Sequence, residues 1–439
     1  MRALLLNCYQ HEACVSRFLL VLFTLFSCLG CDSRQLNAVS GSPPLDIDPP
    51  TPITGLPDPR FAPFDEATLA LMARGHIPGA AVAVAENSRL VFSRGYGWAD
   101  QETKVQVQPN SLFRIGSVTK TITAVAVLKL VERNKLSLDD RAVEVLRQSF
   151  SSPAAFVSAP GTDQITVMHL LTHAGGWDRR YRNDPLLRTS NREAAAVLGI
   201  PTPATALDVV WFTLQKPLDL FPGSKHAYSN VGYCILGRLI EAATGMTYEE
   251  FVQSELLHPC GITDMYIGTG PLSGRREREV TYYNGEGTVE SLYGGNEAVE
   301  WPYGGFCVES LDAAAGWVAT ACDLVTFLCA LEGGPLKPRL LGDQSLFSMF
   351  KNPGPPLWPE NASYYYALGW RVKVDRDGLL WWHNGTMPGT TSVIAHSPKG
   401  LSWAVLMNCR PADWENFNIE LNDRMSRAAA IVAATPKKD

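Results

Sequence analysis

The chain has 439 residues, 46% of them hydrophobic and 19% charged, so it is long enough to bury a large core and its composition excludes a disordered protein. The formal net charge is -6, and basic residues form no extended block. This charge pattern argues against nucleic acid as a partner.

The N-terminal segment has the pattern of an export signal. Arg17 precedes the apolar run FLLVLFTLFSCLG, which is shorter than the roughly 20 residues of a spanning helix but suits a signal core. We therefore expect residues 1–31 to be a signal and the protein to be extracytoplasmic, whether secreted, periplasmic or membrane-anchored. A small residue before Cys28 or Cys31 is similar to bacterial lipoprotein signals, so membrane attachment through a lipid on one of them, and plain signal cleavage, both stay open.

A proline-rich segment follows the expected signal. Residues 32–64 contain many prolines and little apolar periodicity, which predicts an extended linker before a folded domain at 65–439. Six cysteines lie inside that domain. Disulfides are permitted in an oxidising compartment, but a core of this size needs none, so the sequence leaves their pairing open.

The strand patterns lie at the two ends of the domain. Residues 80–100 and 390–409 each hold two β-rich runs around a polar turn, which is typical of a hairpin. Apolar residues recur at helical spacing over 119–134, 166–173, 231–245, 322–331 and 416–434. We predict an α+β fold, an α/β sandwich in which an antiparallel sheet built from both chain ends carries flanking helices and an inserted, mainly helical region.

The stretch RIGSVTKTI places Ser117 three residues before Lys120 at the start of a predicted helix. Positions i and i+3 share a helix face, so the lysine amine can lie beside the serine hydroxyl. A serine hydroxyl becomes a strong nucleophile when a base takes its proton, and a lysine serves as that base when burial or a nearby cation favours its neutral form. A surface helix start is the alternative, because this short motif also occurs by chance.

Two further motifs carry polar groups to helix or strand ends. Tyr228 and Asn230, in YSN, follow a Pro-Gly turn, where a tyrosine can act as a second base; a packed tyrosine and a helix cap are the alternative. The stretch WWHNGTMPG brings His383, Asn384 and Gly385 to a strand edge. A glycine there lets a ligand approach the backbone, and the N–H of Thr386 can donate to an oxyanion, although an ordinary turn has the same pattern.

Together these motifs resemble the serine β-lactamase and penicillin-binding protein superfamily, in its class C-like branch with D-aminopeptidases and β-lactamase-fold esterases. The order Ser-x-x-Lys, Tyr-x-Asn, His-x-Gly matches, and the segments ITVMHLLTHAGGW (165–177) and AAGWVATACDLVTFL (314–328) are similar to family segments. The resemblance covers about residues 65–410. It implies a β-lactamase/transpeptidase-like fold.

The resemblance also implies roles for these residues. Ser117 would be acylated, Lys120 and Tyr228 would form the general base, and Asn230, His383, Asn384 and Gly385 would bind substrate. The N–H groups of Ser117 and Thr386 would form the oxyanion hole. No cofactor or metal is implied, and the partner is a small-molecule or short-peptide substrate.

The third motif departs from the true class C β-lactamases, which have lysine at the position of His383. An imidazole that is mostly neutral at pH 7 replaces a cation that pairs with a β-lactam carboxylate. We therefore expect hydrolysis of an ester or a D-amino-acid peptide rather than efficient β-lactam hydrolysis. A non-catalytic relative that binds peptides or glycan stems is the second hypothesis, and the intact Ser117, Lys120 and Tyr228 argue against it.

One pattern imitates a metal site. His169 and His173 are four residues apart, as metal ligands on a helix are, but no glutamate follows the first histidine as in H-E-x-x-H. The resemblance explains the segment without metal. The sequence does not indicate an oligomeric state.

Overall fold

The computed structural model describes residues 51–436, apart from 154–155, 181–187, 286, 296 and 334–337. The expected signal, residues 1–31, and the linker up to residue 50 lie outside this part of the chain. No helix among the described residues is long and apolar enough to cross a membrane. The six cysteines of the domain are thiols in the structure.

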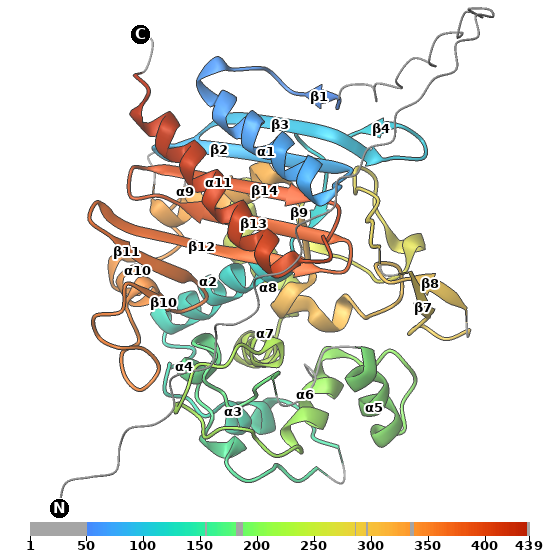
Figure 1. The fold of residues 1–439 in the computed structure, drawn as a ribbon. Coiled ribbons are helices and arrows are strands. Elements are labelled where there is room, and N and C mark those ends of the chain that lie inside the picture. The colour runs from blue at the N-terminus through green and yellow to red at the C-terminus, as the bar shows by residue number, and fades with distance from the viewer. Residues whose placement is uncertain are drawn as a thin grey trace, which may run out of the picture. The chain divides into compact units, whose positions relative to one another are not determined.

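The core of the fold is one antiparallel sheet (Figure 1). Its strands follow the order β1-β3-β2-β14-β13-β12-β11-β10, and β4 pairs with β3. The strands are β1 (Ile53–Thr54), β2 (Gly79–Glu86), β3 (Arg89–Asp100), β4 (Val105–Gln106), β10 (Tyr364–Tyr366), β11 (Arg371–Asp375), β12 (Gly378–Met387), β13 (Thr390–His396) and β14 (Leu401–Met407). Because β2 pairs with β14, the two chain ends meet in the centre of the sheet, as the sequence predicted.

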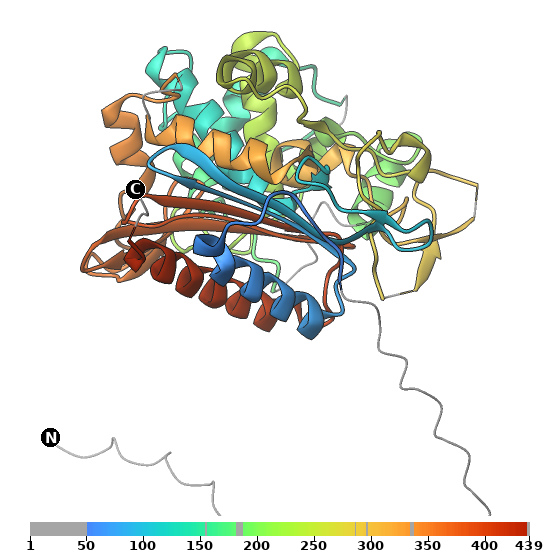
Figure 2. The same ribbon diagram turned by 90° about the horizontal axis from the view of Figure 1, so that it is seen from above.

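Helices cover both faces of this sheet (Figure 2). One face carries α1 (Ala62–Gly75) and α11 (Trp414–Ala434). The other face carries the helical region and its neighbours, which contain α2 (Thr119–Glu132), α3 (Ala142–Ser149), α4 (Val167–Leu171), α5 (Arg188–Leu198), α6 (Ala206–Leu214), α7 (Asn230–Thr244), α8 (Tyr248–Val252), α9 (Ala321–Glu332) and α10 (Asp343–Phe350). The predicted α+β architecture with an inserted helical region is confirmed.

Strand β2 explains why the sheet is buried on both faces. Its valines Val82 and Val84 pack in the core under α1 and α11, while the alternate residues Ala81 and Ala83 pack in the core under the helical region. Side chains alternate across a strand, so small alanines on one face let helices approach closely there. The run GAAVAVAE therefore reads as almost continuously apolar.

Small sheets complete the fold beside the helical region. The chain enters α2 from β5 (Phe113–Arg114), which pairs with β9 (Trp317–Ala319), and β9 pairs in turn with β6 (Tyr266–Ile267). A separate hairpin joins β7 (Thr288–Glu290) to β8 (Ala298–Glu300). The pairing of β5 with β9 fixes the segment that leads into Ser117.

The predicted linker ends earlier than expected. Residues 51–64 belong to the folded unit, because β1 pairs with β3 and α1 begins at Ala62, before the predicted boundary at residue 65. Asp58 caps the turn before α1 by accepting the N–H of Arg60, and the side chain of Phe61 is buried. A short strand at a sheet edge tolerates neighbouring prolines, which is why composition alone hid this segment.

Candidate active site

The segment that carries Ser117 is a tight turn between β5 and α2. Gly116 has φ +52°, a left-handed conformation that favours glycine, and Ser117 stands on the 3-10 turn Gly116–Val118. Lys120 follows in the first turn of α2 and is fully buried. The Lys120 Nζ lies 3.1 Å from the Ser117 Oγ, so the predicted pair forms.

The Lys120 amine has two further oxygen neighbours. It donates to the Oδ1 of Asn230, at 2.7 Å, and to the carbonyl oxygen of Ala314, at 2.7 Å. Asn230 is the first residue of α7, and Ala314 lies in the π-helical turn Asp312–Gly316. The amine also lies within hydrogen-bond distance of the Ser117 hydroxyl. A lysine in its neutral form has two hydrogens, which these two carbonyl groups can accept, and its lone pair is then available to the serine hydroxyl, as a general base requires.

Tyr228 lies beside this amine in the loop before α7. The Lys120 Nζ is 5.0 Å from the centroid of the Tyr228 ring, and the guanidinium of Arg179 is 5.2 Å from the same centroid. Two basic side chains therefore lie close to the phenol ring. Tyr228 and Ser117 line the same cleft, as the YSN motif predicted.

His173 holds the Tyr228 loop in place. The His173 Nδ1 accepts the N–H of Ser229 at 3.2 Å, and its carbonyl oxygen accepts the N–H of Ala227 at 2.7 Å. Its ring packs against that of Tyr228, with centroids 4.1 Å apart and the ring planes tilted by 37°. Burial, with nearby His226 and Lys120, holds the pKa of His173 well below 6.5, so the ring is neutral.

The two histidines of the HLLTH segment serve different purposes. His169 caps α4, because its Nδ1 accepts the N–H of Thr166 at 3.3 Å, whereas His173 contacts Tyr228. Among the described residues no group of three or more metal-ligating side chains is present. The role of His173 was missed in the sequence, although the similarity of its segment to the family was a signal.

The third motif lies where β12 extends past its neighbour. The pairing of β11 with β12 ends at Trp382, whereas β13 pairs with β12 as far as Met387. Residues 383–387 therefore have β13 along one edge and the turn of Ser117 against the strand face. This arrangement brings together motifs that lie more than 260 residues apart in the sequence.

Two glycines allow the backbones to meet at this point. A Cβ on Gly385 would lie 2.0 Å from the Ile115 carbonyl oxygen, and a Cβ on Gly116 would lie 3.0 Å from the backbone N of Thr386. The Ile115 carbonyl also accepts the hydroxyl of Ser392 at 2.7 Å. The contact brings together Ser117 and Thr386, which line the same cleft, and their backbone N–H groups stay the predicted oxyanion hole.

His383 is buried and neutral. Burial first, then Arg371 and Lys120, hold its pKa well below 6.5. Its Nδ1 lies 2.7 Å from the carbonyl oxygen of Asn384, an acceptor, so Nδ1 carries the hydrogen. Its Nε2 lies 3.0 Å from the Tyr366 hydroxyl and accepts from it. His383 thus lines the cleft as a neutral side chain. This agrees with the expectation that the imidazole does not replace the positive charge of a lysine.

Helix α11 supports the outer face of β12. Asn384 and Asn422 exchange two amide hydrogen bonds, at 3.0 and 2.9 Å, and Asn418 donates to the Thr386 hydroxyl at 2.9 Å. Asn384 lines the cleft, but its side-chain amide is engaged by the helix. Its predicted contact with substrate stays a prediction.

Arginines give the cleft its charge. The cleft has a volume of about 380 Å³, and the arginines on its wall are Arg179, Arg371 and Arg410. No Asp or Glu is present among its described lining residues. Arg371, on β11, donates to the Tyr364 hydroxyl at 2.6 Å. Arg179 lies in the segment WDRRYRNDPLLR, whose tryptophan and arginines could from the sequence either line a cleft or pack, whereas no sequence motif marked Arg371 and Arg410.

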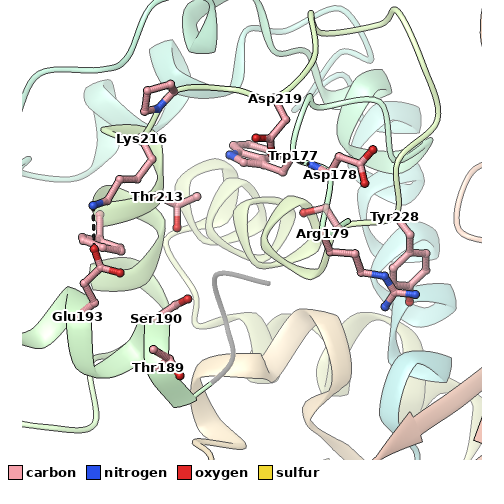
Figure 3. Close-up of a pocket in the computed structure, with 13 residues that line it drawn as sticks. Trp177, Asp178, Arg179, Thr189, Ser190, Glu193, Thr213, Lys216, Asp219 and Tyr228 are labelled. Carbon is pink, nitrogen blue, oxygen red and sulfur yellow. Dashed lines mark hydrogen bonds and ion pairs between the residues drawn. The ribbon is translucent and has the colours of Figure 1, made fainter. Parts of the chain in front are cut away.

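A second cavity adjoins this cleft (Figure 3). We call it the side cavity. Its volume is about 250 Å³, and it shares Arg179 and Tyr228 with the cleft. Its other walls are Trp177, Asp178, Thr189, Ser190, Glu193, Phe212, Thr213, Lys216, Pro217, Asp219 and Ser229.

Comparison with known proteins identifies the family. The model of the family described as "Beta-lactamase" matches residues 64–423. The chain belongs to this family. The match confirms the resemblance inferred from the motifs and the expected fold.

Individual relatives are distant. Protein flp of Staphylococcus aureus strain N315 is 25% identical over 370 residues, which is 82% of this chain and 66% of that protein. Against other flp proteins of this species the match spans 58% of their length.

Two solved structures share the fold. D-amino acid amidase of Ochrobactrum anthropi SV3, with L-phenylalanine amide, is 23% identical with a TM-score of 0.64, and the match covers 85% of this chain and 99% of that one. The octameric penicillin-binding protein homologue of Pyrococcus abyssi is 22% identical with a TM-score of 0.62, covering 84% of this chain and 77% of that one.

Proposed function

We propose that this protein is a serine hydrolase that forms an acyl-enzyme on Ser117 and hydrolyses an ester or amide. The observation that supports this most strongly is the Lys120 amine, which is buried, donates to two carbonyl groups and faces the Ser117 hydroxyl. A decayed site has no need of such an arrangement. This favours catalysis over the second hypothesis of a non-catalytic binding protein.

The residues perform the reaction in two halves. The Ser117 Oγ attacks the substrate carbonyl carbon while its proton passes to the Lys120 and Tyr228 pair. The N–H groups of Ser117 and Thr386 stabilise the oxyanion, and the pair then protonates the leaving group as the carbonyl–leaving-group bond breaks. A water molecule repeats the attack on the acyl carbon, gives its proton to the same pair, and frees Ser117.

The cleft arginines favour a substrate that carries a negative charge. His383 replaces a cationic lysine, but Arg371 and Arg410 line the same cleft. An arginine binds carboxylate through two parallel hydrogen bonds. We infer that a carboxylate on the leaving group is recognised by these arginines, which keeps β-lactams, D-amino-acid peptides and anionic esters as substrates to compare.

The similar proteins support a small acyl substrate. A D-amino acid amidase and a penicillin-binding protein homologue share this fold, which is an argument by analogy for an amide or short peptide. We further propose that the enzyme works outside the cytoplasm. That proposal rests on the apolar run after Arg17, and membrane attachment through Cys28 or Cys31 is a part of it that mass analysis of the exported protein would test.

Matched esters test the proposed function. The acetate ester of 3-hydroxybenzoate has a carboxylate on its leaving group, and that of 3-hydroxybenzamide does not. We expect the anionic ester to have a kcat/KM about 10-fold higher, the scale of one charge-assisted pair. Arg371→Gln should remove most of this preference, and Ser117→Ala should hydrolyse neither ester.

Two results would count against the proposal. Full turnover by Ser117→Ala would exclude Ser117 as the nucleophile. Tight binding of the anionic ester with no hydrolysis by the unsubstituted protein would favour the non-catalytic alternative.

A further inference from the structure

One acceptor of the Lys120 amine belongs to the π-helical turn Asp312–Gly316, which we call the π turn. Such turns are rare and often occur at functional sites. The carbonyl oxygen of Ala314, in this turn, accepts from the Lys120 amine at 2.7 Å. The preceding carbonyl, of Ala313, accepts from the hydroxyl of Thr123 at 2.7 Å. Two side chains of α2 therefore bind consecutive carbonyl groups of the π turn, and the place of the Lys120 amine depends on where this turn lies.

The end of the π turn is tied to the segment that carries Ser117. Trp317 follows the turn, and its N–H donates to the Thr119 hydroxyl at 3.3 Å. Its carbonyl oxygen accepts the N–H of Ile115 at 2.9 Å. These bonds fix the end of the π turn, whereas its start at Asp312 is held by a different element.

Arg238, in the middle of α7, holds the start of the π turn. Its guanidinium donates to the Asp312 Oδ2 at 2.5 Å, and the other carboxylate oxygen accepts the N–H of Ala313. The side chains of Arg238 and Asp312 are buried, at 5% and 13% exposed. The Asp312 carboxylate thus links α7 to the residue that precedes Ala314.

Glu241, one turn later on α7, extends this network. Its Oε1 accepts from the Arg238 guanidinium and from the N–H of Tyr248, each at 3.0 Å. The Tyr248 hydroxyl lies 2.7 Å from the hydroxyl of Thr123, which leads back to the π turn. Burial opposes the charge of Arg238, but the carboxylates of Asp312 and Glu241 hold its pKa above the usual value. The guanidinium therefore stays charged in the interior.

Gly237 provides an observation that is independent of these charges. A Cβ at this position would lie 2.6 Å from the Cβ of Ala313, a distance at which two carbon atoms overlap. A glycine inside a helix weakens the helix relative to alanine. The close approach of α7 to the π turn accounts for glycine at this position.

We propose that Arg238 and Asp312 are positioning residues for the reaction, which act on Lys120 through the π turn. They set the place of the Ala314 carbonyl, and that carbonyl orients the amine. Neither residue lines the cleft. A buried ion pair is weak evidence for stability, because desolvation offsets the attraction of the charges, so positioning is the role that the geometry favours. This inference rests on the proposed function of Lys120 as a general base.

Asp312→Asn tests the pair, because the amide keeps the size of the carboxylate and loses its charge. We expect kcat to fall about 10- to 100-fold for both esters of the proposed function, the scale of a misplaced catalytic group. KM should stay the same, because both halves of the reaction use the same base and the cleft is unaltered. The preference for the anionic ester should also stay. An unchanged kcat in folded Asp312→Asn would overturn the role of Asp312.

Asp343→Asn is the matched control for that substitution. Asp343 is 88% exposed at the start of α10, where it pairs with Arg339. The change of charge is the same but lies far from the network, so kcat should not change. An equal loss of kcat in the two variants would show that the effect is not transmitted by the π turn.

A double variant keeps the test valid if Asp312→Asn does not fold. Arg238→Met combined with Asp312→Leu removes both charges, so no buried charge is left without its partner and stability should be largely kept. Urea unfolding measures this. We expect a folded protein with low kcat, because the N–H of Ala313 loses its acceptor. A folded double variant with the full kcat would refute the positioning role.

Gly237→Ala tests the same element without a change of charge. The added methyl group should displace the π turn and lower kcat at constant KM. Gly232→Ala, in the same helix, is its control, because the nearest atom to the new Cβ would be 3.7 Å away. Equal kcat in these two variants would contradict the dependence of Lys120 on the close packing of α7.

Acylation by p-nitrophenyl acetate distinguishes the inference from the proposed function. The unsubstituted protein should form an acyl-enzyme on Ser117, and Asp312→Asn should form it about 10- to 100-fold more slowly. Equal acylation rates would overturn the positioning role alone and leave the proposed function intact. No acylation of the unsubstituted protein would refute the proposed function itself, and this inference with it.

Discussion

The cleft at Ser117 and the side cavity adjoin, but different kinds of chemical group form them. Around Ser117 the groups are buried and held largely by backbone, through the Ala314 carbonyl, the Ile115 carbonyl and the glycines at 116 and 385. The side cavity is lined by charged side chains from helices and loops, several of them half exposed. Under the proposed function, the reaction centre would depend on fixed geometry, and substrate choice on side chains that can be replaced.

The largest effect is expected at Lys120. Lys120→Met removes the base and leaves the carbonyl groups of Asn230 and Ala314 without their donor. Loss of a general base costs about 10²- to 10⁴-fold in rate, so kcat/KM should fall by that amount for every ester. A Lys120→Met enzyme that hydrolyses some esters at the full rate would contradict the proposal that Lys120 serves the reaction of every ester.

The contact between the turn at Gly116 and Gly385 on β12 should be the most sensitive to added volume. Gly385→Ala would place a methyl group 2.0 Å from the Ile115 carbonyl oxygen, and that backbone is held by Ser392. We expect unfolding to require about 3 kcal/mol less free energy, and acylation of Ser117 to be lost with the displaced Thr386 N–H. Denaturant unfolding and acetate acylation measure the two effects.

Gly232→Ala is the matched control for that substitution. Gly232 lies in α7, and the nearest atom to an added Cβ would be 3.7 Å away, on Leu170. Alanine is favoured over glycine in a helix, so this variant should be as stable as the unsubstituted protein or up to about 1 kcal/mol more stable. Equal losses in the two variants would show that the site does not depend on the close contact.

A smaller effect is expected from pH. Burial lowers the pKa of His173 and His383 well below 6.5, and burial with Arg371 lowers that of His226 to about 4. The unfolded chain then binds more protons than the folded one below pH 6.5. Stability should be constant above that pH and should fall below it, by up to about 1.4 kcal/mol per pH unit for each histidine, with the His226 contribution complete near pH 4.

His226→Gln should make this slope shallower by the contribution of one proton. Urea unfolding at intervals from pH 8 to 4.5 measures it, with the same substitution at exposed His258 as the control. Stability that stays level from pH 8 to 5 in the unsubstituted protein would show that the histidines behind Tyr228 are not held neutral.

The sequence predicted the residues that are proposed to carry the chemistry better than the groups that hold them. Ser117, Lys120, Tyr228 and Asn230 could be named because each belongs to a short motif at a helix start. The Ala314 carbonyl could not be predicted, because every residue has a backbone carbonyl and the residue type does not show which one accepts a hydrogen bond. Arg371 could not either, because its place beside β12 depends on the register of β11.

The sheet shows the same division. Its composition from both chain ends followed from hairpin patterns in residues 80–100 and 390–409, and the central pairing of β2 with β14 confirmed it. The short edge strand β1 was hidden among prolines, and the prediction placed the domain start too late. Strong periodicity predicts an element, whereas two residues paired at an edge have no periodicity to detect.

The most direct test of the central claim is the intact mass of the protein after brief exposure to p-nitrophenyl acetate and, separately, to a penicillin, followed by peptide mapping. We predict a covalent adduct on Ser117 with the ester, which disappears as water releases it, and none in Ser117→Ala. The penicillin arm shows whether β-lactams also acylate the site. Adducts that form equally in Ser117→Ala, or no adduct and no released nitrophenol, would contradict the assignment of Ser117 as the nucleophile.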